Sequence, residues 1–259
     1  MLLQGKRVIV TGGVTGIGRA TVLACAREGA SVVSFSTAAP DRNRVVRLLD
    51  EVEAMGAGRA RHLQVDISDQ ARVDAAVDEA ADWMGGLDGL VNSAATQTFK
   101  PADQFTREDL LADLAVNTFG TVYTNQAAYR HMKDHGGSIV NVTSYVAIGG
   151  QDNLAGYGLA KGAVNGWSHV IAREWGKRLI RVNLMAPVVE STGFRAYYEH
   201  LSPEGKLQSD QRRAETIALG GKLGSTGDAG NVNAFLISDL SKYMTGQIFY
   251  VDGGVSFSR

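Results

Sequence analysis

The chain has 259 residues with 26 basic and 27 acidic side chains, and its formal net charge is −1. This balance excludes the basic excess that is typical of nucleic-acid-binding proteins. Cys25 is the single cysteine and the five histidines show no close ligand spacing, which excludes an internal disulfide and predicts no metal site.

Strand and helix patterns alternate from the first residues onward. Lys6–Thr11 is a β-branched run that ends in glycines, which predicts a buried strand, and Gly16–Gly29 has the pattern of a helix closed by a glycine. The same reasoning predicts strands at Ser31–Ser36, Arg59–Asp66, Leu87–Asn92, Ser138–Ser144, Leu179–Met185 and Gln247–Val251. It predicts helices at Asn43–Gly56, from about Ser68 to Met84, before about His131, from about Gly156 to Gly176 and near Asp228–Ser238.

Seven predicted strands alternating with six predicted helices require crossover connections. We therefore expect an α/β fold of the Rossmann type, with one doubly wound parallel sheet in the strand order 3-2-1-4-5-6-7 and helices on both faces. No linker or composition shift interrupts the pattern, so residues 1–259 are expected to form a single domain.

One segment, Val188–Leu223, breaks the alternation. It mixes aromatic, charged and glycine positions without a clean period. A stretch of this length between regular elements is usually functional. We expect it to be a loop or lid over the substrate, with an ordinary pair of surface helices as the alternative.

Three glycines, at positions 12, 16 and 18, lie between the first predicted strand and the first predicted helix. Glycines allow a tight turn and a close approach of the backbone to a pyrophosphate, and the helix that follows directs its free N–H groups at the anion. This context predicts a dinucleotide site at the turn, formed by Gly12, Val14, Thr15, Gly16, Ile17 and Gly18.

Tyr157 and Lys161 are four residues apart on a predicted helix and therefore lie on one face. A nearby ammonium favours the phenolate, so Tyr157 is the candidate general acid/base. Ser144, at the end of a predicted strand, can hydrogen-bond the substrate oxygen. Asn117 is a poor helix former inside a predicted helix, and we expect it to mark a local distortion that holds a water on a proton path to Lys161.

The motif T-G-G-x-x-G-I-G at residues 11–18, taken with Asn117, Ser144, Tyr157 and Lys161, resembles the short-chain dehydrogenase/reductase superfamily. The resemblance covers about residues 5 to 254 and includes N-S-A-A at 92–95 and D-G-G at 252–254. It implies that these four residues form the catalytic tetrad of an NAD(P)-dependent oxidoreductase acting on a secondary alcohol/ketone pair. Val188 departs from the family pattern by replacing a glycine, which narrows the pocket beside the nicotinamide.

The resemblance also assigns binding residues. It implies cofactor contacts by Asp66, Ile67, Asn92, Ala94, Tyr157, Lys161, Pro187, Val189 and Thr192. It implies substrate contacts by Thr96, Gln97, Ser144, Tyr145, Gln151, Phe194 and Tyr197, which suggests a moderately polar small-molecule carbonyl or alcohol substrate.

The end of the second predicted strand bears on the choice of cofactor. A carboxylate at this point binds the ribose 2′-OH of NAD, and here the residues are Ser36 and Thr37. Their hydroxyls can bond a 2′-phosphate, with Arg42 or Arg44 supplying charge. The sequence therefore favours NADP(H) over NAD(H), while Asp41 would favour NAD(H) if the loop brought it to the ribose.

Two other functions remain open. One is a ketoreductase of the 3-oxoacyl-(acyl-carrier-protein) reductase type, for which we expect a basic patch at the entrance, and the candidate entrance residues are mixed in sign. The other is a non-catalytic dinucleotide-binding sensor, which the presence of all four catalytic residue types argues against.

Gly158, Gly162 and Gly166 recur every four residues on one predicted helix, a smooth stripe suited to close packing. Members of the family often assemble through this helix, so we expect a homo-oligomer, and specifically a homotetramer. No apolar run approaches the ~20 residues that span a bilayer, and no signal-peptide pattern is present. We expect a cytoplasmic protein without a membrane or nucleic-acid partner.

Overall fold

The computed structural model describes residues 1–256, and its strands form one parallel sheet in the order β3-β2-β1-β4-β5-β6-β7, as predicted. The strands are β1 (Arg7–Thr11), β2 (Ser31–Ser36), β3 (Arg59–Gln64), β4 (Gly89–Asn92), β5 (Gly137–Val142), β6 (Ile180–Pro187) and β7 (Ile248–Val251). Two residues that were predicted to end strands, Asp66 and Ser144, lie two positions past β3 and β5. Both are therefore in the loops at the carboxyl edge of the sheet.

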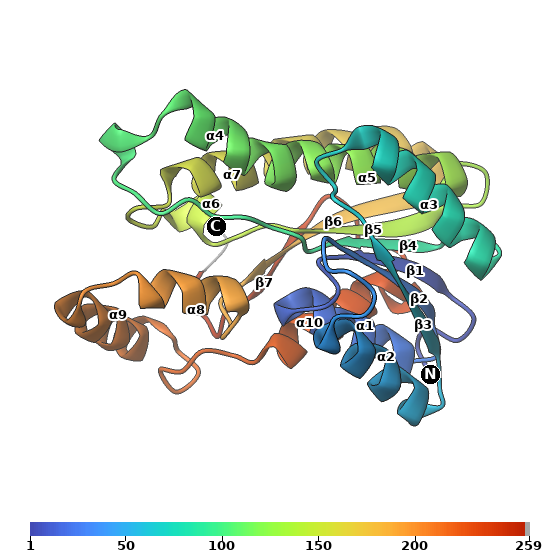
Figure 1. Cartoon of the computed structure of the whole chain (residues 1–259), viewed down its shortest axis with the longest axis horizontal. Coiled ribbons are helices and arrows are strands. Elements are labelled where there is room, and N and C mark those ends of the chain that lie inside the picture. Colours follow the sequence, from blue (N-terminus) through green and yellow to red (C-terminus); the bar gives the residue numbers. More distant parts are fainter. Residues whose placement is uncertain (257–259) are drawn as a thin grey trace.

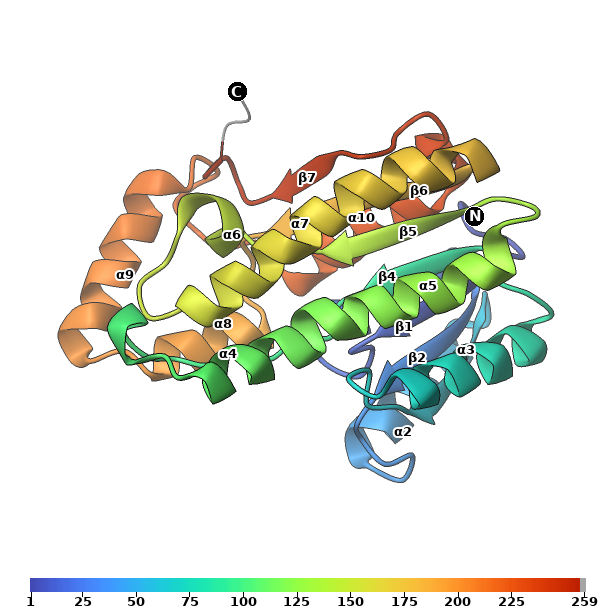
Figure 2. The same cartoon turned by 90° about the horizontal axis from the view of Figure 1, so that it is seen from above.

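Helices cover both faces of the sheet, with α1, α2 and α10 on one side and α3, α5 and α7 on the other (Figures 1 and 2). The α-helices are α1 (Gly16–Arg27), α2 (Asn43–Met55), α3 (Gln70–Met84), α4 (Arg107–Leu114), α5 (Thr121–Met132), α6 (Val146–Gly149), α7 (Ala155–Trp175), α8 (Thr192–Glu199), α9 (Pro203–Thr216) and α10 (Thr226–Ile237). The short elements are η1 (Ala102–Gln104), η2 (Ala115–Gly120), η3 (Gly176–Arg178) and η4 (Asp239–Ser241).

The predicted number of six helices is too low. The single helix expected before His131 is divided into α4, the π-helix η2 and α5. The helix α6 was not predicted, and α8 and α9 were predicted only as the alternative for Val188–Leu223. The segment Val188–Leu223 holds two of these, α8 and α9, so it is helical and not irregular. Both lie at the carboxyl end of the sheet, apart from the helices that cover its faces (Figure 2).

The core consists of two apolar layers, one on each face of the sheet. Adjacent strand residues alternate between them, so that Val10 packs with α1 and α10 while Ile9 packs with α3 and α5. Both residues are fully buried. This burial on two sides explains why the central strands are continuous apolar runs.

The first and last long helices pack directly against each other. Asn233 on α10 donates a hydrogen bond from Nδ2 to Thr21 Oγ1 on α1, at 2.9 Å, and both side chains are fully buried. A Cβ added at Gly230 would lie 2.7 Å from the carbonyl oxygen of Ala20, so only glycine allows this approach. The glycine turn at the start of α1 is therefore supported by a helix more than 200 residues away in sequence.

No helix in residues 1–256 is long and apolar enough to cross a membrane.

Candidate active site

The glycine turn after β1 lies against the segment after β4. Gly12 has a φ of +66°, and a Cβ there would lie 2.9 Å from the backbone of Ala94. Thr11 Oγ1 accepts hydrogen bonds from the backbone N–H groups of Ser93 and Ala94, each at 3.1 Å. These contacts bring two strand ends together and leave space for a ligand in front of the turn.

The N-terminus of α1 fits the pyrophosphate of a dinucleotide. Its N-cap residue, Thr15, makes no side-chain cap hydrogen bond, and no acidic residue stands in the first turn. The N–H groups at this end thus keep their positive partial charge available to an anion. Gly16 has a φ of +52°, and a Cβ there would lie 2.9 Å from Thr192 Oγ1, so the turn also contacts the start of α8.

A buried polar network fixes the helix that carries Tyr157 and Lys161. Asn92 Nδ2 donates to Asn125 Oδ1 at 3.0 Å and to Asn141 Oδ1 at 2.9 Å, while its Oδ1 accepts from Thr124 Oγ1 at 2.8 Å. Asn141 Nδ2 donates to Ser168 Oγ on α7 at 2.9 Å. The network therefore joins β4, α5, β5 and α7.

Tyr157 and Lys161 both lie in the first two turns of α7, and both are buried. Lys161 Nζ donates to the backbone oxygen of Val142 at 2.9 Å and lies 5.7 Å from the centre of the Tyr157 ring. Burial lowers the pKa of Lys161 to about 8. Thr118 Oγ1 on η2 donates to the oxygen of Ala160 at 3.0 Å, which fastens this part of α7 from its other side.

Ser144 and Gln97 line the same cavity as Tyr157. Burial raises the pKa of Tyr157, the hydrogen bonds of Ser144 and Gln97 lower it, and the carboxylate of Asp113 raises it further. Desolvation disfavours a phenolate, whereas hydrogen-bond donors favour it. The net direction is upward, so in the protein alone Tyr157 is a phenol.

The helix distortion expected at Asn117 is present as the π-helix η2. Asn117 is fully buried, and its Nδ2 donates to the oxygens of Thr96, at 2.9 Å, and Asp113, at 2.8 Å. Thr98 Oγ1 donates to Asp113 Oδ1 at 3.1 Å. Among residues 1–256, Asn117 Oδ1 and Asp113 Oδ2 are buried acceptors without a partner.

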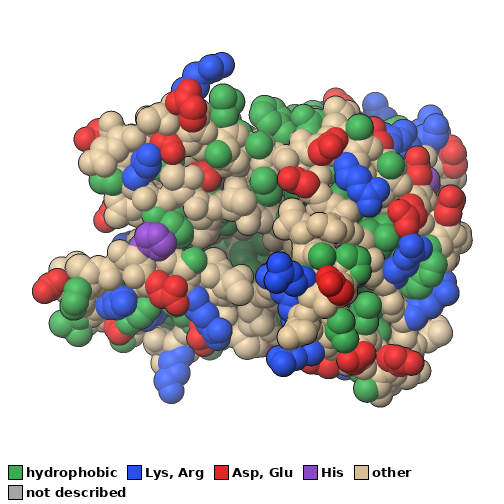
Figure 3. All heavy atoms as spheres, in the orientation of Figure 1, with side chains coloured by type: hydrophobic (Ala, Val, Ile, Leu, Met, Phe, Trp, Pro, Cys, Tyr) green, Lys and Arg blue, Asp and Glu red, His purple; other side chains and the backbone are tan. Residues whose placement is uncertain are grey.

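These groups surround one cavity of about 1030 Å³. It forms the hollow between the side of α4 and α7 and the side of α8 and α9 in Figure 3. The predicted site residues that line it are Gly12, Val14, Thr15, Ile17, Ser36, Thr37, Asp66, Ile67, Ala94, Thr96, Gln97, Ser144, Tyr145, Gln151, Tyr157, Lys161, Pro187, Val189, Thr192, Phe194 and Tyr197. Gly16, Gly18, Asn92 and Asn117 do not line it. Gly16, Gly18 and Asn117 each contact a residue that does, whereas Asn92 bonds Asn141.

The end of the cavity beside β2 is polar. Ser36, Thr37 and Arg44 line it, whereas Asp41 and Arg42 do not. No ion pair within residues 1–256 includes Arg44.

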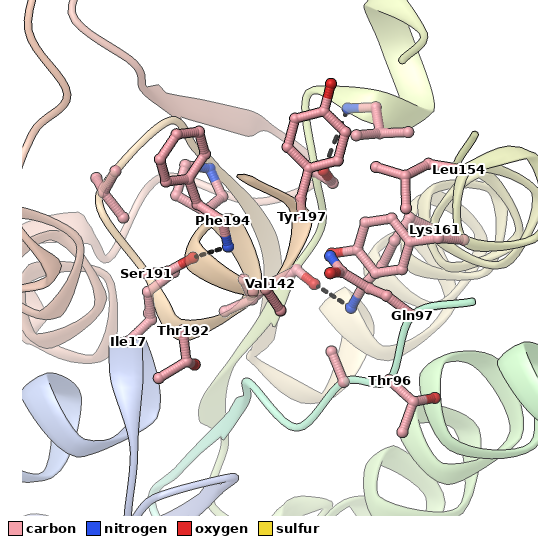
Figure 4. A pocket seen from close by; sticks show the side chains of 18 of the residues that line it. Ile17, Thr96, Gln97, Val142, Leu154, Lys161, Ser191, Thr192, Phe194 and Tyr197 are labelled. Carbon is pink, nitrogen blue, oxygen red and sulfur yellow. Dashed lines mark hydrogen bonds between the residues drawn. The ribbon is translucent and has the colours of Figure 1, made fainter. Parts of the chain in front are cut away.

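The opposite wall of the cavity is formed by α8 and α9. Tyr197 accepts a hydrogen bond on its hydroxyl from Gln151 Nε2 at 2.5 Å, and His200 stacks on Phe99 with ring centres 4.5 Å apart. Figure 4 shows Phe194 and Tyr197 on this wall, with Lys161 and Gln97 across from Ser191 and Thr192.

Several lining residues were not predicted as site residues. Phe99, Asp152, Leu154, Arg212, Arg213 and Ile217 belong to this group. Asp113 was also missed, although an acidic residue one helical turn before Asn117 was a usable signal.

In residues 1–256 no group of three or more His, Cys, Asp or Glu side chains is placed to hold a metal ion.

Comparison with known proteins relates the whole chain to oxidoreductases. Residues 12–256 match the family model described as enoyl-(acyl carrier protein) reductase. The chain is 33% identical to L-2,3-butanediol dehydrogenase of Corynebacterium glutamicum, over 98% of this chain and 100% of that protein. It is 33% identical to 3alpha-hydroxysteroid dehydrogenase of Mediterraneibacter gnavus, over 98% of each chain.

Solved structures agree with this relation. Carveol dehydrogenase from Mycobacterium avium in complex with NAD has a TM-score of 0.88 to this chain at 27% identity, covering 98% of both chains. A short-chain type dehydrogenase/reductase from Mycobacterium ulcerans also has a TM-score of 0.88, at 31% identity, covering 98% of this chain and 91% of that one.

Proposed function

The chain belongs to the short-chain dehydrogenase/reductase superfamily of oxidoreductases, and we propose that it interconverts a secondary alcohol and a ketone with Tyr157 as general acid/base. One observation carries the proposal. The Tyr157 hydroxyl and Ser144 line the same cavity as the glycine turn after β1, so a reacting oxygen and a dinucleotide can occupy that cavity together. Lys161 lines the same cavity, and Asn117 is bonded to the backbone oxygen of Thr96, which lines it too.

A nicotinamide cofactor held by the glycine turn and by Pro187, Val189 and Thr192 would supply the hydride for reduction of the carbonyl carbon. Tyr157 gives its hydroxyl proton to the carbonyl oxygen, and Ser144 donates a hydrogen bond to the same oxygen as charge develops on it. Lys161, whose pKa is about 8, is ionised at neutral pH and favours the phenolate that remains. Asn117 helps to hold the water through which the proton is restored.

For the cofactor we propose NADP(H). Ser36 and Thr37 offer hydroxyl groups and Arg44 offers a positive charge at the end of the cavity beside β2. No carboxylate in residues 31–46 lines the cavity to repel a 2′-phosphate. The solved carveol dehydrogenase contains NAD, so the preference rests on this chain's own residues.

For the assembly we propose a homotetramer that uses the exposed face of α7. A Cβ added at Gly162 or Gly166 meets no atom within 4 Å, and Leu159 and Val170 are exposed apolar side chains on the same helix. A smooth stripe flanked by apolar groups suits packing against a second copy. Light scattering at micromolar concentration tests this, and a stable monomer contradicts it.

We propose that the chain is a single domain in which the segment of α8 and α9 closes over the substrate. Phe194 and Tyr197 supply apolar surface to the cavity, and Gly193 and Gly205 lie at the start of each helix. Segments that close over substrates are drawn from weakly packed parts of a fold.

The experiment that tests the function follows cofactor absorbance with NADH and NADPH against a panel of ketones and secondary alcohols. The panel spans small diols and steroids, since the relatives named above act on both classes. It also includes acyl groups on a carrier protein, because the matching family model is described by a carrier-dependent reaction. Turnover of no member, with cofactor bound, would support a non-catalytic sensor.

A further inference from the structure

The helix α9 directs a polar face at the cavity. The residues of this helix that line the cavity are Gly205, Gln208, Ser209, Arg212, Arg213 and Thr216. They alternate between steps of three positions and one position, which is the spacing of a single face of an α-helix. The apolar side chains of Leu207 and Ala214 are not among them. The surface that α9 presents to a substrate is therefore polar.

The charges of α9 are separated by sign. Arg212 and Arg213 line the cavity. The carboxylates of the same helix, which belong to Glu204, Asp210 and Glu215, do not line it. This wall of the cavity is therefore positive, although the helix as a whole carries charges of both signs.

The two arginines differ in their partners. Arg213 forms an ion pair with Asp210, donates from Nη1 to Ser209 Oγ at 2.7 Å, and lies 4.9 Å from the ring centre of Phe194. Arg212 is exposed, and within residues 1–256 it takes part in no ion pair. In the described part of the chain, the charge of Arg213 is thus balanced by the protein, whereas the charge of Arg212 is available to a ligand.

A carboxylate also lines this part of the cavity, in the loop between α6 and α7. It belongs to Asp152, which forms no ion pair with either arginine among the described residues. Burial raises the pKa of Tyr197, and Asp152 raises it further. Arg212 and Arg213 lower it. These charges act around Tyr197, so an anion that binds here is attracted by α9 and repelled by Asp152.

The helix α8 adds an apolar surface to the same wall. Phe194, Tyr197 and Leu201 line the cavity, and Figure 4 shows the first two. A guanidinium group binds a carboxylate through two parallel hydrogen bonds. One unpaired guanidinium balances the single charge of a carboxylate, whereas a phosphate monoester carries a charge of about −2 at neutral pH. The wall therefore suits an apolar chain that ends in a carboxylate.

We infer that the substrate is a keto acid or the corresponding hydroxy acid, whose carboxylate binds Arg212 while its apolar chain contacts α8. This inference rests on the proposed function and names its substrate class. In reduction, the carbonyl group gains a hydride from the reduced cofactor and a proton from Tyr157, and it becomes a hydroxyl group. The carboxylate is unchanged by the reaction and serves for binding.

The test compares charged and uncharged substrates of the same shape. The probes are methyl ketones that end in a carboxylate after two to six methylene groups, each paired with its methyl ester. At the best chain length, we expect the wild type to favour the acid over the ester by about tenfold or more in kcat/KM. Added salt should reduce this preference, because Arg212 is exposed.

Three variants locate the carboxylate. Arg212→Gln should lose most of the preference for the acid, through KM more than through kcat, because the carboxylate lies away from the reacting carbonyl. Arg212→Lys keeps the charge without the two parallel hydrogen bonds and should retain part of the preference. Asp152→Asn removes the repelling carboxylate and should increase it.

Arg195→Gln is the matched control. Arg195 belongs to α8, pairs with Glu190 at 3.0 Å and does not line this cavity. The variant should keep the preference of the wild type for the acid. Cofactor binding, measured by fluorescence, shows that each variant is folded.

The outcomes separate this inference from the proposed function. A wild type that reduces the esters as well as the acids at every chain length overturns the inference and leaves the proposed function in place. The same holds if Arg212→Gln keeps the full preference, or if acyl groups on a carrier protein are preferred to every free acid. Turnover of no ketone or alcohol, with cofactor bound, overturns the proposed function and the inference with it.

Discussion

The two walls of the cavity are built in different ways. On one side, Tyr157 and Lys161 are buried on α7, and hydrogen bonds join this helix to β5 and η2. On the other side, α8 and α9 contain no buried residue and meet the rest of the protein through partly exposed contacts such as that between Gln151 and Tyr197. The difference teaches that the proposed proton donor lies among fixed, preorganised groups, whereas the wall that we propose to close over the substrate is more weakly packed.

The substitution with the largest expected effect on the buried wall is Tyr157→Phe. The change keeps the ring in its pocket and removes the hydroxyl that we propose as the proton donor, so turnover should fall on the order of 10³-fold. Cofactor affinity and thermal stability should stay near wild type. Single-turnover kinetics with the best member of the substrate panel measure the loss, and residual activity above a tenth of wild type would refute the role of Tyr157.

The ionisation of Lys161 tests how much the burial of this side chain lowers the free energy of unfolding. Its pKa is lowered from 10.5 to about 8 by burial, so the unfolded chain binds more protons between pH 8 and pH 10.5. Stability should therefore rise with pH across this window, by at most about 3 kcal/mol. Urea unfolding of the cofactor-free protein measures it.

Lys161→Met is the matched variant for this experiment. It should lack the rise in stability between pH 8 and pH 10.5, and it should lose activity and part of its cofactor affinity. A wild-type curve without any rise across the window would mean that water reaches Lys161 in the folded protein.

We expect the choice of cofactor to depend on the end of the cavity beside β2. Ser36→Asp places a carboxylate beside the 2′-phosphate and should shift preference toward NAD(H) by about 1–3 kcal/mol. Arg44→Ala should shift it in the same direction by less. Arg42→Ala is the control, since Arg42 does not line the cavity. The ratio of kcat/KM for NADPH and NADH is the measurement, and a wild type that strongly prefers NADH argues against NADP(H).

The smallest expected effect is on the wall formed by α8 and α9. Tyr197→Phe removes the hydrogen bond to Gln151 and should raise substrate KM about two- to tenfold with little change in kcat. It should also speed limited proteolysis within 188–223 when no ligand is present. Tyr198→Phe is the control, because that hydroxyl bonds Asp210 on α9 instead. Cleavage rates that ligands do not change would leave α8 and α9 as an ordinary surface helix pair.

Much of the buried wall could be predicted because the sequence patterns that indicate it are local. The sheet order follows from alternating strands and helices, and the pairing of Tyr157 with Lys161 follows from helical spacing. The hydrogen bond between Asn117 and Thr96 joins residues 21 positions apart and has no local pattern. The helices α8 and α9 were predicted only as an alternative because neither contains a buried residue, and an apolar period is the main signal for a helix.

Asn92 shows the limit of assigning a role by motif. The motif placed it among the cofactor contacts, whereas its amide lies in the buried network with Asn125 and Asn141 and does not line the cavity. Asn92 ends β4 at the carboxyl edge of the sheet, as predicted. Which way its side chain points depends on partners that come from α5 and β5.

The packing of α10 on α1 has a consequence for how the protein is made. The glycine turn leaves the ribosome among the first twenty residues, yet the helix that supports it, with Asn233 bonded to Thr21, is synthesised last. Contacts between distant parts of a chain form slowly, because a long loop must close first. This end of the cavity is therefore completed only when nearly the whole chain has been translated. A chain that stops before α10 contains the glycine turn without the helix that supports it.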